Sequence, residues 1–210
     1  LIEEAIEEYN RALELKPNYA HAYNNLGTAM KKYGNLEASV QAYKKALSLK
    51  PDYVEVYNNL GISLKNQGKQ NEAISFYKKA LSLNPDYAQV YNNLGTILHE
   101  NENLEKAIEF YQKALSSDPN YAEAHKNLGI AFQSLGKFDK AIKSYNKALA
   151  IKPSLNGAKH MLSALSGEKR NSAPIEYIQE LFDRYASDFE NALVQKLEYQ
   201  IPKILSEIIL

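Results

Sequence analysis

Paired asparagines recur in this sequence at a fixed spacing, and their side chains could bind a peptide backbone. YNNLG stands at residues 23–27, 57–61 and 91–95, and the variant HKNLG stands at 125–129. A carboxamide is both a donor and an acceptor, so a row of Asn side chains can form hydrogen bonds with the peptide groups of an extended chain whatever its side chains are. Asn is a poor helix former, and Gly costs about 1 kcal/mol against Ala inside a helix, so their recurrence requires a cause.

Residues for other kinds of chemistry are poorly represented. There is no Cys, which excludes disulfide scaffolds, thiolate metal sites and cysteine nucleophiles. His21, His99, His125 and His160 do not share a register, so they do not indicate a metal site. We find no phosphate-binding loop, no H-E-x-x-H sequence and no nucleophile–base pair. The sequence therefore predicts no catalytic residue, no metal ligand and no cofactor in this chain.

Charge and hydropathy limit the partners. The chain has 25 basic and 25 acidic residues; from Glu168 onward there are 5 basic and 8 acidic residues, net −3, which leaves +3 for the part before it. Neither value indicates a nucleic-acid partner, and the many Tyr residues are more typical of core than of base stacking. The sequence has no signal peptide and no apolar run of 18 residues that could span a bilayer. We therefore expect a soluble, cytoplasmic protein.

The elements that must position the asparagines repeat every 34 residues. Gly27, Gly61, Gly95 and Gly129 keep this step, and so do five prolines from Pro17 onward. Such a period indicates stacked supersecondary units. Within the unit 20–53, apolar periodicity predicts one helix at about 20–33 and another at about 36–49, separated by Gly34 and followed by Pro51. The fold class predicted is all-α.

The period also divides the chain. The predicted parts are the second helix of a truncated unit (1–19), four units (20–53, 54–87, 88–121 and 122–155), a terminal capping helix (156–167), a polar linker (168–173) and a helical extension (174–210). Because the sequence begins midway through a unit, we expect a fragment of a longer protein. Its open edge at Leu1 could stack on another molecule, so self-association through the ends of the array is expected.

A helical wheel separates a packed face from a polar one. At 100° per residue, Tyr23, Leu26, Gly27 and Met30 fall on one face about 100° wide, which we expect to pack inward. Gly on this face, opposite small residues such as Ala46, would let two helices approach closely. The paired asparagines and the Thr that follows them fall away from this face, so the wheel predicts that they point to solvent or to a ligand.

The pattern of large and small residues resembles the tetratricopeptide repeat. In the first complete unit the matching residues are Tyr23, Leu26, Gly27, Met30, Ser39, Tyr43, Ala46 and Pro51, with Ser39 in place of the usual Ala. The resemblance implies a right-handed superhelix in which the polar face of each first helix lines a concave groove that binds an extended peptide or a protein. The groove residues expected from it are Asn24, Asn25, Thr28, Asn58, Asn59, Asn92, Asn93, Lys126 and Asn127.

The alternative is that these are solvated polar residues copied when the units duplicated. Other outward positions have changed from unit to unit, since His21 corresponds to Glu55, Gln89 and Glu123, whereas Asn25 is kept in four copies. We therefore favour a ligand-contacting role. A second file, from Arg11 through Lys45, Lys79, Lys113 and Lys147, is basic in every copy; a solvated outer face is favoured for it over an acidic docking strip.

Two further resemblances give alternatives to a noncatalytic scaffold. The Asn file is similar to the one in the repeats of O-linked N-acetylglucosamine transferase, which implies a glycosyltransferase array. Residues 177–202 resemble the helical lead-in of bacterial S-adenosylmethionine-dependent methyltransferases fused to tetratricopeptide arrays. The matching residues are Leu181, Phe182, Asp183, Tyr185, Ala186, Phe189, Leu193, Leu197, Tyr199 and Pro202. This implies a substrate-recruiting arm whose S-adenosylmethionine site lies in a downstream domain; a helical cap is the alternative for the same segment.

Overall fold

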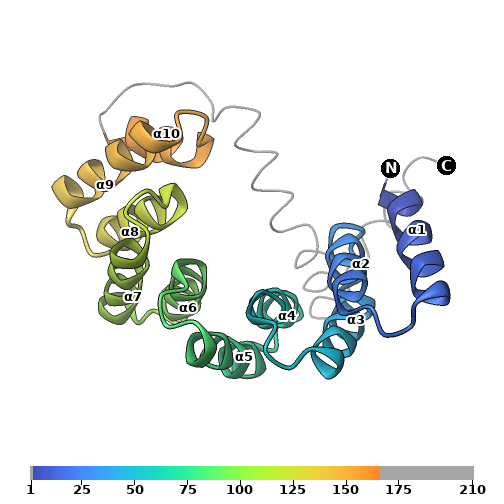
Figure 1. Cartoon of the computed structure of the whole chain (residues 1–210). Coiled ribbons are helices and arrows are strands. Elements are labelled where there is room, and N and C mark those ends of the chain that lie inside the picture. Colours follow the sequence, from blue (N-terminus) through green and yellow to red (C-terminus); the bar gives the residue numbers. More distant parts are fainter. Residues whose placement is uncertain (1, 166–210) are drawn as a thin grey trace, which may run out of the picture. The chain divides into compact units, whose positions relative to one another are not determined.

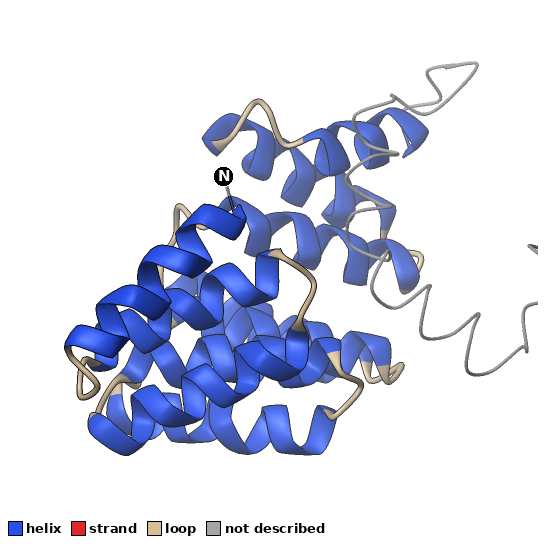
Figure 2. Ribbon diagram, turned by 90° about the vertical axis from the view of Figure 1, so that its right-hand side faces the viewer, coloured by secondary structure: helices blue, strands red, loops and turns tan. Residues whose placement is uncertain are grey.

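The computed structural model describes residues 2–165, and every regular element in that part of the chain is an α-helix. Consecutive helices are joined by short loops (Figure 2). Their bounds are α1 (Ile2–Leu15), α2 (Ala20–Lys32), α3 (Leu36–Leu49), α4 (Val54–Asn66), α5 (Gln70–Leu83), α6 (Ala88–Glu100), α7 (Leu104–Ser117), α8 (Ala122–Ser134), α9 (Phe138–Ile151) and α10 (Asn156–Leu165). The predicted all-α array of helix pairs is confirmed over these residues. The predicted linker, the helical extension with its methyltransferase-like segment, and residues 166–167 of the capping helix lie outside the described residues.

The turn within each pair needs one residue with a left-handed backbone. Gly34 has φ +91°, and the next amide, from Asn35, donates to the Met30 carbonyl at 2.9 Å, which closes the end of α2. Gly68 and Gly136 have the same role, with φ +74° and +68°. In the third pair the corresponding residue is Glu102, with φ +59°, although a side chain disfavours this conformation.

The turn between pairs contains the repeated Pro. Helix α3 ends at Leu49, and Pro51 follows two residues later, where its missing N–H breaks no helical bond. The Tyr57 hydroxyl donates to the Pro51 carbonyl at 2.9 Å. This bond fixes the turn against the helix that follows it.

Two layers of helices position the candidate site. Each of α2, α4, α6 and α8 packs against the second helix of its own pair and also contacts the next helix in this series. Figure 1 shows these first helices along the inner side of an arc, with α3, α5, α7 and α9 outside them. The face of each first helix that is turned away from its own second helix therefore lies on the inner side of the array.

The repeated Gly allows a tyrosine ring to lie against the helix backbone. A Cβ atom built on Gly61 would lie 2.4 Å from Cε1 of Tyr77, and one on Gly27 would lie 2.7 Å from Cε1 of Tyr43. Both tyrosines are fully buried. The neighbour of the Gly is thus a ring of the second helix, rather than the small Ala46 as predicted, because the wheel of one helix does not show which partner residue faces it.

Candidate functional site

The first Asn of each pair is buried between neighbouring units. Asn24, Asn58 and Asn92 are only 4%, 6% and 6% exposed, and Lys126, at the corresponding position of the fourth unit, is 8% exposed. The prediction that this file points to solvent or to a ligand is therefore wrong. The helical wheel considers a single helix, whereas the first helix of the next unit covers this flank.

The buried file accepts hydrogen bonds from the second Asn of the following unit. Each bond joins residues 35 apart, one more than the repeat length. The pairs are Asn59 Nδ2 to Asn24 Oδ1 at 3.1 Å, Asn93 Nδ2 to Asn58 Oδ1 at 2.9 Å and Asn127 Nδ2 to Asn92 Oδ1 at 2.9 Å. We call this set of bonds the asparagine ladder. It links four consecutive inner helices. The first Asn of one unit and the second Asn of the next, both predicted to contact a ligand, are thus hydrogen-bonded to each other.

A tyrosine from the turn between units adds a second contact to the ladder. Burial raises the pKa of Tyr53, and a hydrogen bond from the Asn24 side chain partly opposes that rise. Burial likewise raises the pKa of Tyr87, with an opposing hydrogen bond from Asn58. The buried carboxamide thus interacts with both the Tyr and the second Asn of the next unit, a role that the sequence analysis missed. The sequence contains one signal for this role, because the second Asn of each unit stands 35 residues after the first Asn of the preceding unit.

The ladder ends where both of these partners are lost. In the register of Tyr53 and Asn59, the segment after the fourth unit has Leu155 and Met161, which offer no side-chain hydrogen-bond donor. At the same junction the acceptor position is Lys126, whose Nζ pairs with the Glu123 carboxylate of its own helix. The substitution of Lys for Asn therefore coincides with the loss of the residues that Asn would bind.

The second Asn of each pair stays accessible on the inner side. Asn25 is exposed, and Asn59, Asn93 and Asn127 are half-buried. The ladder uses one N–H of each of the last three; within residues 2–165 their Oδ1 atom and second N–H form no hydrogen bond. These four side chains are the part of the predicted site that retains free hydrogen-bonding groups.

Thr28 is half-buried and its hydroxyl is already engaged. Its Oγ1 donates to the Asn24 carbonyl at 3.1 Å and lies 3.0 Å from the Tyr43 hydroxyl. In the third unit, Thr96 Oγ1 donates to the Asn92 carbonyl at 3.0 Å. Thr28 therefore holds the core tyrosine and has less capacity for a ligand than the prediction assumed.

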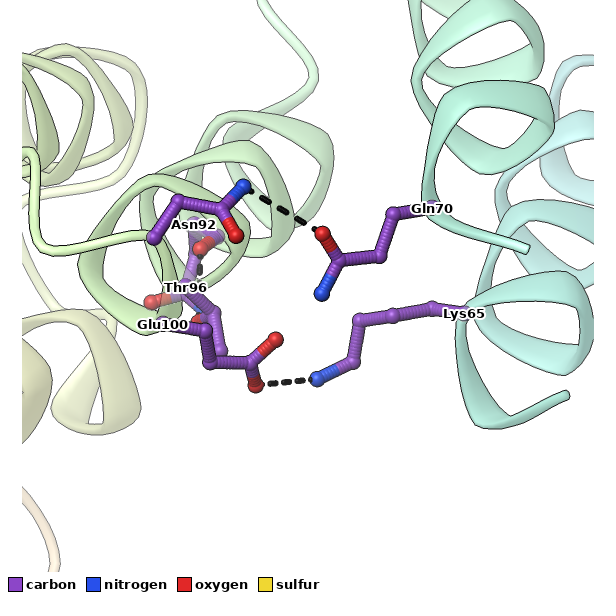
Figure 3. Close-up of polar contacts among 6 residues, drawn as sticks. Lys65, Gln70, Asn92, Thr96 and Glu100 are labelled. Atoms are coloured by element: carbon purple, nitrogen blue, oxygen red, sulfur yellow. Dashed lines mark hydrogen bonds and ion pairs between the residues drawn. The ribbon is translucent and has the colours of Figure 1, made fainter. Parts of the chain in front are cut away.

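Further polar contacts join the second and third units near the ends of their helices. Figure 3 shows Lys65 of α4 reaching toward Glu100 of α6, with Nζ 2.6 Å from Oε1. Beside this ion pair, Asn101 Nδ2 donates to Gln70 Oε1 at 3.2 Å. Together with the ladder, these contacts join the two units at several points along their helices.

Residues 2–165 contain neither a cluster of metal-ligating side chains nor a membrane-spanning helix. Over that range no group of three or more His, Asp or Glu side chains is placed to hold a metal ion. No helix there is long and apolar enough to cross a bilayer.

Comparison with solved structures supports the fold. MamA is 29% identical, with a TM-score of 0.62 over 72% of this chain and 89% of its own. The PilF protein of Pseudomonas aeruginosa is 20% identical, with a TM-score of 0.66 over 88% of this chain and 96% of its own. YrrB, described as a tetratricopeptide repeat protein with an unusual peptide-binding site, is 24% identical, with a TM-score of 0.57 over 76% of this chain and 82% of its own. At these lower identities, PilF and YrrB show the fold alone.

Comparison with protein families identifies the repeats. No curated protein matches the chain. That this chain is not an enzyme stays a prediction. The glycosyltransferase and methyltransferase resemblances are not supported by any of these matches and stay predictions. Family models of the tetratricopeptide repeat match residues 2–34, 31–68, 54–87 and 86–154. These matches together span residues 2–154, and the chain belongs to the tetratricopeptide repeat family.

Proposed function

We propose that this chain is a protein-binding scaffold that holds an extended segment of a partner on its inner surface, through Asn25, Asn59, Asn93 and Asn127. The observation that carries the proposal is the recurrence of an accessible carboxamide at the same position of four consecutive inner helices. A repeated row of identical polar groups matches the repeating donors and acceptors of a peptide backbone, and it does not require a particular partner sequence.

The ladder supports this role because it orients the row. One N–H of Asn59, Asn93 and Asn127 is bound to the preceding unit, so the side chain loses little rotamer freedom when a ligand binds to the remaining groups. The buried residues Asn24, Asn58 and Asn92 act in this proposal as positioning residues rather than as ligand contacts.

The test begins with a peptide selected from a random library for binding to the chain. A copy of this peptide with N-methylated backbone amides should bind at least tenfold more weakly, because the carboxamide oxygens then lack donors to accept from. Copies with single side chains replaced by Ala should bind with smaller losses. A selected peptide whose N-methylated copy binds equally well would contradict backbone recognition.

Variants of the chain then locate the site. Asn25→Ala removes an accessible carboxamide that forms no ladder bond within residues 2–165, so it should weaken peptide binding with little change in stability. Asn146→Ala is the matched control, since Asn146 is an exposed Asn on the outer helix α9. Equal peptide affinity of the chain and of a variant with all four accessible Asn residues replaced would refute the proposed groove.

A further inference from the structure

The fourth unit lacks an aromatic pair that the second and third units have. There, a Tyr of the first helix packs against a Phe of the second; the pairs are Tyr57–Phe76 and Tyr91–Phe110, each with ring centroids 6.2 Å apart. The corresponding residues of the fourth unit are His125 and Ser144. His125 Nε2 keeps the hydrogen bond of the Tyr, donating to the Pro119 carbonyl at 3.0 Å, but both substitutions reduce the volume of the side chain.

A hollow of about 640 Å³ occupies this position, lined by residues of α7, α8 and α9. Its apolar lining includes Leu115, Leu128, Phe132 and Ile151, and both His125 and Ser144 contribute to it. The volume is within the range of small-molecule sites, roughly 300–1,000 Å³, and is ample for one aromatic side chain. Since α7 and α9 belong to the outer layer (Figure 1), the hollow is distinct from the inner surface of the proposed groove.

The rim of the hollow is basic. Lys140, Lys143 and Lys147 recur at three- and four-residue intervals, which places them on one face of α9, and all three contribute to the lining. The lining contains no Asp or Glu, and none of the three lysines forms an ion pair with a residue of the described part of the chain. Lys140 Nζ lies 5.6 Å from the centre of the Phe132 ring, over the apolar lining.

This combination is specific to the fourth unit. The residues of the third unit in register with the three lysines include an acid, since they are Lys106, Glu109 and Lys113. The second unit has Glu72, Ser75 and Lys79. The first complete unit also lacks the pair, because Ala42 stands in the register of Phe76, but its residues in register with the three lysines are Ala38, Gln41 and Lys45. Among the four complete units, the fourth alone combines the missing pair with an entirely basic helix face.

We propose that the hollow is a second binding site, which receives an aromatic side chain from an acidic segment of a partner protein. The ring would occupy the space that Phe76 and Phe110 fill in their own units. Carboxylates on either side of it would meet the lysine rim, where no acidic residue of the lining competes for them.

The probe is a short fluorescein-labelled peptide of alternating Asp and Glu with one central Phe, titrated with the full chain at low salt and followed by fluorescence anisotropy. We expect saturable binding, and at least fivefold weaker binding of the peptide in which Ala replaces the Phe. Equal affinity of the two peptides, or no binding of the Phe peptide, would overturn the proposal. The proposal would also be overturned if an oligothymidine displaced the Phe peptide and bound the chain more tightly than the peptide does.

Two variants place the peptide in the hollow. His125→Tyr combined with Ser144→Phe restores the pair of the preceding units, so it should fill the space and weaken binding at least fivefold. Lys147→Glu alters an exposed side chain and should have a similar effect, whereas Lys45→Glu, the same change at the equivalent position of the first complete unit, should have none. Unchanged affinity in both test variants would refute the site. Asn59→Ala should leave the affinity for the Phe peptide unchanged, so the result for this hollow is independent of the result for the proposed groove.

Discussion

The asparagine ladder predicts a measurable coupling between units. Asn58→Ala removes the acceptor of Asn93 Nδ2, 2.9 Å away. This hydrogen bond contributes about 1 kcal/mol net, so we expect a loss of about 1 kcal/mol in the free energy of unfolding. Asn93→Ala leaves the Oδ1 of Asn58 buried without this donor, which costs about 1–2 kcal/mol.

The double variant tests whether the two losses have a common origin. If the Asn58–Asn93 bond is real, removing both side chains should cost about 1 kcal/mol less than the sum of the single changes. The assay is urea unfolding followed by circular dichroism, fitted with a nearest-neighbour scheme suited to repeat arrays. The matched control combines Asn58→Ala with Asn127→Ala; these residues belong to different pairs of the ladder, so their effects should add. Additive losses for Asn58 and Asn93, within about 0.3 kcal/mol, would refute the ladder as a source of stability.

Three more predictions follow from the packing. Gly61→Ala should destabilise the chain by about 1–2 kcal/mol in urea unfolding. Overlap of the new Cβ with the buried Tyr77 ring costs about 1–3 kcal/mol, which outweighs the gain of about 1 kcal/mol in helix propensity. An unchanged or raised stability would contradict the close contact. Glu102→Gly should stabilise the chain by about 0.5–1 kcal/mol in thermal unfolding, since φ +59° is unfavourable for Glu. A loss of stability would show that the substitution relieves no backbone strain. Burial raises the pKa of Tyr111 to about 12, so folding favours the neutral side chain; this contribution to the free energy of unfolding should persist below pH 10 and decline between about pH 10 and 12. Tyr111→Phe should make this decline shallower when unfolding is measured over a series of pH values. An unaltered decline would exclude Tyr111 as its source.

The repeat pattern made the fold predictable, because the positions of Gly, Pro and large apolar residues recur in every unit. A 34-residue period with two apolar segments per unit is sufficient to indicate helix pairs and their turns. The partner of a given residue was less predictable. Gly27 required a close neighbour, but only the packing of α2 against α3 shows that this neighbour is Tyr43.

The candidate site could be predicted in part. A wheel drawn for one helix correctly separates Leu26 from Asn25, but it places Asn24 on the polar side because it omits the next unit. Burial of Asn24 arises from contact with α4, which carries Asn59. Contacts between units depend on the angle at which one pair stacks on the next, and a single-helix pattern contains no information about that angle.

The asymmetric arrangement of the ladder has a consequence for how such a protein changes length in evolution. Each of the units 54–87 and 88–121 contains both the Asn that donates backward and the Asn that accepts from the next unit. Duplication of either unit in tandem would therefore create a new junction with a donor and an acceptor already in place. The unit 122–155 can donate but has Lys126 as its acceptor position, so a copy added after it would begin with an unmatched Asn. We therefore expect insertions and deletions of whole units to be tolerated in the middle of this array and disfavoured after its fourth unit.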